Sequence, residues 1–116
     1  SYTEFQYGVV TPSSTTVKRG EKLSVEVTVT NVGKRDGAET VHWFISDPYC
    51  SITRPVKELK HFEKQFIKVG ETRTFRFDVD LELDLGFVDG NGKRFLEAGE
   101  YNIGVQDQKV KIELID

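Results

Sequence analysis

Apolar residues stand at every second position in several short segments of this chain, and few folds accommodate that pattern. Between residues 23 and 30, Leu and Val alternate with Ser, Glu and Thr. Because successive side chains of a strand point to opposite sides of a sheet, this alternation predicts a strand with one buried and one exposed face. The same pattern predicts four further strands, and weaker patterns predict two more: residues 41–46, 75–81, 101–105 and 110–114, and residues 3–9 and 60–67.

Turn-forming residues separate the predicted strands. Asn31 and Gly33 follow the first clear strand. The run Asp89-Gly90-Asn91-Gly92 is typical of a hairpin turn, because Gly and Asn tolerate positive φ. No segment carries a sustained helical period. About seven short strands predict one all-β domain spanning residues 1–116, folded as an antiparallel two-sheet sandwich.

Composition and charge exclude several classes of function. Apolar residues make up 37% and charged residues 30% of the chain, which is the balance of a soluble globular domain. The net charge of −3 argues against a nucleic-acid partner, because such proteins normally carry a basic surplus. No apolar run approaches the length of a membrane span, so we expect no membrane partner either.

The sequence offers no recognisable catalytic or metal-binding group. Cys50 is the only cysteine, so no internal disulfide forms, and no base is recognisable that would make it a nucleophile. The acidic residues Asp78, Asp80, Glu82 and Asp84 recur at every second position. This spacing predicts a solvated face of a strand rather than a catalytic pair. We therefore expect no catalytic residue, no metal and no cofactor in this chain.

The longest segment without an alternating pattern runs from residue 47 to residue 59. It contains Asp47-Pro48 and Arg54-Pro55, where each proline holds the preceding residue extended. A loop of this length in a compact domain is usually functional or docked on something. At such a contact, Arg54 would make paired hydrogen bonds to a carboxylate or to backbone carbonyls.

The strand pattern indicates where three aromatic residues lie. The alternation over residues 41–46 places Trp43 in the core and turns Phe44 outward. An outward aromatic residue is either a ligand platform or covered by another part of the protein, and we favour cover by the long loop or by a further domain. Tyr101 follows Gly99 at the start of a strand, which is typical of a tyrosine corner. Trp43 and Tyr101 are therefore interpreted as structural.

Motifs along nearly the whole chain resemble one known family. They are Ser-Tyr-Thr-Glu-Phe-Gln-Tyr at residues 1–7, Thr-Asn-Val-Gly at residues 30–33, Thr-Arg-Pro-Val-Lys-Glu-Leu-Lys at residues 53–60 and Glu-Ala-Gly-Glu-Tyr at residues 97–101. Together they resemble the C-terminal fibronectin type III-like domain of family 3 glycoside hydrolases, which implies an immunoglobulin or fibronectin type III-like sandwich. The chain departs from the family at His61, Ala98 and Arg94, where Gly, Pro and Trp are usual.

The resemblance implies a non-catalytic accessory domain that docks on the preceding catalytic domains of the same polypeptide and stabilises them. The parent would be a β-glucosidase or β-xylosidase that acts by the retaining two-carboxylate mechanism, in the periplasm or outside the cell. The expected docking residues are Phe44, Asp47, Arg54, Pro55, Lys57, Glu58 and Phe62.

Two other hypotheses stay open at this point. A carbohydrate-binding module would need several exposed aromatic side chains on one face to stack on sugar rings, and Phe44, Tyr49 and Phe87 are its candidates. Carbohydrate is therefore the alternative partner. A stand-alone enzyme would need a cleft and a nucleophile–base pair, for which nothing in the sequence argues.

Overall fold

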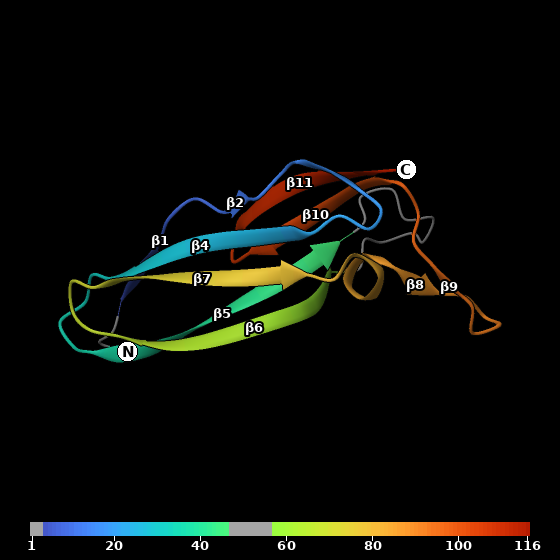
Figure 1. The fold of residues 1–116 in the computed structure, drawn as a ribbon. Helices are drawn as coiled ribbons and strands as arrows, with labels where there is room; N and C mark the ends of the chain where they lie inside the picture. The colour runs from blue at the N-terminus through green and yellow to red at the C-terminus, as the bar shows by residue number, and fades with distance from the viewer. Residues whose placement is uncertain (1–3, 47–56) are drawn as a thin grey trace.

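The computed structural model describes residues 4–46 and 57–116, and all of its strands except β8 and β9 form two sheets packed face to face (Figure 1). In the first sheet, β4 (Leu23–Asn31) lies between β7 (Thr72–Val79) and the short strands β1 (Phe5–Tyr7) and β2 (Thr11–Pro12). The second sheet has the order β3 (Thr16–Lys18), β11 (Gln108–Ile115), β10 (Gly99–Val105), β5 (Gly37–Ser46) and β6 (Lys57–Ile67). Neighbouring strands are antiparallel, except that β3 and β11 pair in parallel. The predicted all-β, two-sheet sandwich is confirmed.

The core lies between the two sheets and is built from the alternating apolar positions. Every second side chain of β4 from Leu23 to Val29 is buried, as are Trp43, Phe75 and Phe77. The rings of Trp43 and Phe77 lie 5.9 Å apart between the sheets. Because side chains of this chain fill the core by themselves, we expect the domain to fold without a partner.

A buried polar residue, Asn31, fastens one end of the sandwich. Its side-chain amide donates to the backbone carbonyls of Arg35 (2.8 Å) and Ile67 (3.0 Å), and its side-chain oxygen accepts from the backbone N–H of Gly33 (2.9 Å). Asn31 is fully buried, so an unpaired amide there would be costly. The predicted turn after β4 is thereby tied to the end of β6.

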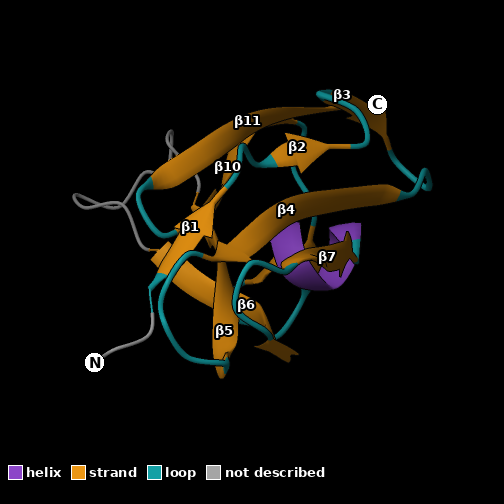
Figure 2. Cartoon of the chain, turned by 90° about the vertical axis from the view of Figure 1, so that its left-hand side faces the viewer, coloured by secondary structure: helices purple, strands orange, loops and turns teal. Residues whose placement is uncertain are grey.

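The chain after β7 departs from the prediction of a longer strand. β7 ends at Val79, and Leu81–Leu85 form a single helical turn, η1, which Figure 2 shows behind β7. The sequence Leu-Glu-Leu-Asp-Leu fits a strand, but Leu81 and Leu85 are four residues apart and both buried, as on one side of a helix. The prediction of one continuous row of acidic side chains on a strand is therefore wrong beyond Asp78.

Hydrogen bonds to two acidic side chains hold η1 in place. The Asp80 carboxylate accepts the backbone N–H of Leu83 at 3.0 Å, and the Asp84 carboxylate accepts the backbone N–H of Asp80 at 2.7 Å. Partial burial raises the pKa of the Asp84 carboxyl above its usual value. Both carboxylates are thus engaged in capping this turn of the chain.

Two further features complete the fold. The predicted turn at residues 89–92 is confirmed: it joins β8 (Phe87–Val88) to β9 (Arg94–Phe95), and Gly92 has a φ of 81°. β6 begins at Lys57, so residues 57–59 belong to a strand and not, as predicted, to the long loop.

Among the described residues, no helix has the length and apolar character needed to cross a membrane.

Candidate interface on the outer face of β5 and β6

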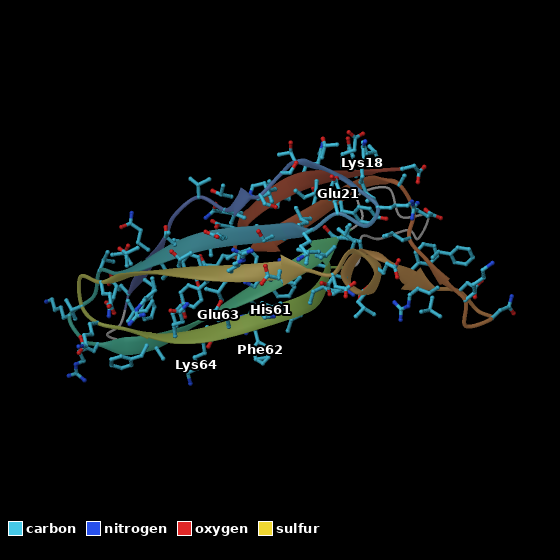
Figure 3. The ribbon with its side chains drawn as sticks, viewed as in Figure 1. Lys18, Glu21, His61, Phe62, Glu63 and Lys64 are labelled. Atoms are coloured by element: carbon cyan, nitrogen blue, oxygen red, sulfur yellow. The ribbon has the colours of Figure 1, made fainter. Side chains whose placement is uncertain are left out.

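Part of the apolar surface of β6 faces away from the core. Leu59, Phe62 and Phe66, which we call the apolar stripe, are exposed at 50%, 60% and 55%. Figure 3 shows Phe62 pointing away from the sandwich, whereas His61 and Glu63 lie on the side of β7. β6 is the last strand of its sheet, and in the described part of the chain no strand pairs with its other edge.

A β-bulge keeps the apolar stripe on one face. The register of β5 and β6 shifts by one residue between Trp43 and Phe44, which leaves Lys60 as an extra residue in β6. In a regular strand without a bulge, Leu59 and Phe62, which are three positions apart, would point to opposite faces of the sheet. The bulge therefore brings Leu59 directly opposite Phe44, on the outer face.

The structure brings four of the predicted docking residues to this region. Phe44 is half-buried, and the Nζ atom of Lys57 lies 4.6 Å from the centre of its ring. Glu58 pairs with Lys60, with a carboxylate–ammonium distance of 3.2 Å, and Phe62 belongs to the apolar stripe. The other predicted docking residues, with two further residues that the sequence singled out, lie outside the described residues: Asp47, Arg54, Pro55, Tyr49 and Cys50.

Sequence reasoning missed Leu59 and Phe66. The lysines at positions 57, 60 and 64 favour a solvated face for this segment, and the apolar residues between them do not alternate regularly. The signal that finds them is an apolar residue at positions 59, 62 and 66 of one strand, read with a one-residue bulge.

A shallow groove of about 700 Å³ continues the outer face beyond Phe44. Its walls carry Ser46, Lys57, Asn102, the turn at residues 106–107 and the first two residues of β11. Gly104 lies opposite Phe44 in the register of β5 and β10, and a Cβ there would come within 3.1 Å of a backbone oxygen. The groove thus combines one aromatic ring with hydroxyl, amide and ammonium groups.

The inner side of β6 seals the open edge of β7. The Glu63 carboxylate accepts the backbone N–H of Arg76 (3.1 Å), and the Gln65 amide donates to the backbone carbonyl of Thr74 (2.8 Å). His61 stacks on Phe77 with ring centres 5.1 Å apart. These contacts occupy strand-edge groups of β7 that would otherwise attract another strand. β6 therefore has one side committed to its own domain and one side uncovered.

Trp43 and Tyr101 lie where a structural role requires them. Trp43 is fully buried, and its indole N–H has no hydrogen-bond partner among the described residues. The Tyr101 hydroxyl donates to the backbone carbonyl of Glu97, four residues upstream, at 2.6 Å. This is the geometry of a tyrosine corner.

The Asp89 carboxylate has a local structural role. The Asp89 carboxylate accepts the backbone N–H groups of Asn91 and Lys93, both at 2.9 Å, so it holds the β8–β9 turn. Residues 4–46 and 57–116 contain no group of three or more His, Cys, Asp or Glu side chains placed to hold a metal ion.

Comparison with known proteins identifies the family. A family model described as a fibronectin type III-like domain matches residues 39–109. The periplasmic β-glucosidase of Salmonella typhimurium is 43% identical over 113 residues, which cover 96% of this chain and 15% of that protein. A β-xylosidase of Formosa agariphila is 35% identical over 90% of this chain and 14% of its own length.

Solved structures agree with the sequence relatives. A β-glucosidase from Erythrobacter marinus superimposes with a TM-score of 0.90 at 33% identity, over 98% of this chain and 16% of that chain. A β-glucosidase from Listeria innocua superimposes with a TM-score of 0.83 at 31% identity, over 99% of this chain and 16% of that chain. The resemblance seen in the sequence is thereby confirmed: this chain spans about 15% of the length of its relatives and belongs to the fibronectin type III-like domains of family 3 glycoside hydrolases.

Proposed function

We propose that this chain is a non-catalytic accessory domain that docks the outer face of β5 and β6 on the catalytic domains of its own polypeptide. The observation that carries the proposal is the apolar stripe: three large apolar side chains in one strand, each at least half exposed. Apolar surface gathered in this way on a sheet face marks a contact site.

The energetics of the stripe favour a covered state. Full burial of a Phe or Leu side chain is worth roughly 1.5–3 kcal/mol relative to exposure. Contacts between domains of one chain bury about 600–1,500 Å², an area that a stripe of three such residues with its polar surroundings would help to supply. The stripe would therefore stabilise both the domain and its neighbour.

Charged residues at the end of the stripe would orient the contact. Lys57 and Glu58 lie at the start of β6, beside the groove at Phe44. Such groups contribute more to the choice of partner and its orientation than to the strength of binding. Asp47, Arg54 and Pro55 stay predicted members of the same contact.

We further propose that the parent polypeptide is a β-glucosidase or β-xylosidase of the retaining type, located in the periplasm or outside the cell. The relatives named above support the enzyme class and the location, because three of them are β-glucosidases, one is a β-xylosidase and one is periplasmic. The chemistry would belong to the remainder of that polypeptide.

Expression of the parent as two pieces, this chain and the remainder, tests the proposal. Wild-type pieces should co-purify, and glucosidase or xylosidase activity and thermal stability should be higher in the mixture than in the remainder alone. The double variant Phe62→Ser, Phe66→Ser should lose this association. The matched control is Thr28→Ala with Thr74→Ala, a cross-strand pair on the outer face of the other sheet. Wild-type pieces that do not co-purify, with no gain in activity or thermal stability in the mixture, would contradict the proposal.

A second candidate function is carbohydrate binding, favoured by the groove beside Phe44. The groove has a volume in the range of small-molecule sites and offers an aromatic ring with polar neighbours. Lys57 lies over the ring and would have to move before a sugar could stack there. Affinity electrophoresis of the isolated chain on soluble β-glucans and xylans tests this function. Retardation that Phe44→Ala abolishes would support it, and unchanged mobility on every polysaccharide would exclude it.

A further inference from the structure

The β8–β9 hairpin, residues 87–95, is a second uncovered region of the molecule, and we call it the arm. We propose that the arm is a separate docking element that packs its aromatic side chains on the remainder of the same polypeptide, independently of the apolar stripe. This inference rests on the proposed function, because it takes the catalytic part of the parent as the partner.

The arm stands apart from both sheets. β8 and β9 form a two-stranded sheet of their own, and Figure 1 shows them projecting beyond the end of the sandwich. Phe87, Val88 and Phe95 are exposed at 45%, 52% and 37%, and none of them belongs to the core. The arm therefore presents apolar side chains that its own domain covers only in part.

The base of the arm is built to hold it in one position. At Gly86, a Cβ would come within 2.2 Å of the Glu82 carbonyl oxygen and 2.9 Å of the Phe95 carbonyl oxygen, so only glycine fits between η1 and the hairpin. Leu81 and Leu85 anchor η1 in the core. This packing fixes the direction in which the hairpin leaves the sandwich.

The arm itself is also ordered in advance of any contact. The rings of Phe87 and Phe95 stack with centres 5.6 Å apart, and the Nζ atom of Lys93 lies 5.4 Å from the centre of the Phe95 ring. The Asp89 carboxylate closes the turn at the tip. An isolated two-stranded hairpin is marginal in water, so a partner surface would stabilise this one. A pre-ordered contact element loses less conformational entropy when it binds.

The proportions of the related proteins identify the occupant. This chain covers 15% of a related β-glucosidase and 16% of a solved β-glucosidase chain, so most of each single polypeptide lies outside the region matched here. Partner surface on the same polypeptide is always present at high effective concentration, and two contacts in different directions fix orientation as one contact cannot. A second copy of the chain would have to compete with that tethered partner.

Trypsin cleavage at the tip tests the proposal, because Lys93 and Arg94 are exposed there. In the full-length parent, cleavage after these residues should be about tenfold or more slower than in the isolated chain, since covered segments must open before they are cut. The variant Phe87→Ala, Phe95→Ala in the full-length protein should restore rapid cleavage at the tip. The matched control Thr28→Ala, Thr74→Ala should leave it slow.

The outcomes separate this inference from the proposed function. Carbene labelling reports whether Phe62 is covered in the full-length protein. Equal cleavage at the tip in the full-length and isolated wild-type proteins, with Phe62 still protected from labelling in the full-length protein, would overturn the arm proposal and leave docking through the apolar stripe intact. Equal cleavage with Phe62 unshielded would overturn both. Slow cleavage in the isolated chain that depends on its concentration would show self-association and would also overturn the proposal. The wild-type comparison decides by itself if the alanine variant fails to fold.

Discussion

The outer face of β4 and β7 carries polar side chains, whereas the outer face of β5 and β6 carries the apolar stripe. On the polar face, the hydroxyls of Thr30 and Thr72 lie 2.7 Å apart, and the Arg76 guanidinium lies 2.8 Å from Asp78 and 3.7 Å from Glu26. Both faces belong to the same sandwich and cover the same core. The difference between them therefore reflects what lies outside: water on one side and, by our proposal, protein on the other.

By our proposal, this small sandwich reserves one face for a partner. Alternating polar residues complete the face of β4 and β7, so nothing needs to cover it. On β6, the inner side chains Glu63 and Gln65 are bound to β7, while the outer apolar ones have no such contact. β6 thus binds β7 through its inner side chains and, by our proposal, contacts another domain through its outer ones.

The largest effect is expected below both faces, in the core that they share. Trp43→Ala removes the largest fully buried side chain and should lower the free energy of unfolding of the isolated chain by about 3–5 kcal/mol. Urea denaturation followed by circular dichroism measures this. The control His42→Ala changes the next side chain, which is exposed, and should cost much less. Similar costs for the two would mean that the inner and outer positions of β5 are wrongly assigned.

The next effect separates the two outer faces. Phe62→Ser with Phe66→Ser should lower the unfolding free energy of the full-length parent by roughly 1.5–3 kcal/mol in all, because by our proposal the exposed half of each ring is buried there. In the isolated chain the same double variant should change stability by only about 0.5 kcal/mol. Calorimetry of both proteins measures the difference. Thr28→Ala with Thr74→Ala should lower the unfolding free energy by the same amount in the two proteins. If the stripe variant also cost the same in both, the proposed difference between the two faces would be wrong.

A smaller effect tests the sheet that carries the apolar stripe. Tyr101→Phe deletes the hydroxyl that donates to the Glu97 carbonyl, and should cost about 1 kcal/mol in the isolated chain, as for a typical hydrogen bond. Chemical denaturation measures it. Tyr101→Leu, which also removes the buried ring, should cost more. If wild type and Tyr101→Phe were equally stable, the hydrogen bond of the tyrosine corner would not contribute to stability.

The smallest effect belongs to the polar face. Arg76→Ala breaks ion pairs with Glu26 and Asp78 that are open to solvent, so it should destabilise the chain less than Tyr101→Phe does. Any loss should vanish in about 1 M salt, where exposed charges are screened. Unfolding curves at low and high salt check this. A loss that persists in high salt would show that the polar face is more than a solvated surface.

The sequence predicts the core well because each long strand buries one side and exposes the other. Val25 and Val27 in β4 and Trp43 in β5 lie inward as their alternation indicates. The turn at residues 89–92 is also predictable, because Gly and Asn tolerate the positive φ that tight turns require. These features depend on local sequence alone.

Features that depend on packing are not visible in the same way. The spacing of Leu81 and Leu85 fits both the two-residue period of a strand and the four-residue spacing of one helical face. The Asp80 cap and the burial of both leucines stabilise the helical turn. The apolar stripe escapes alternation because the bulge at Lys60 changes the spacing between Leu59 and the residues that follow. Register is set by pairing with β5, which no single-strand pattern contains.

Carbene footprinting of the full-length parent and of the isolated chain, resolved by residue, tests the central claim most directly. We expect Phe62 and Phe66 to be labelled strongly in the isolated chain and weakly in the full-length protein, while Thr28 and Thr74 are labelled equally in both. Equal labelling of the apolar stripe in the two proteins would show that no partner covers this face, and would contradict docking through it.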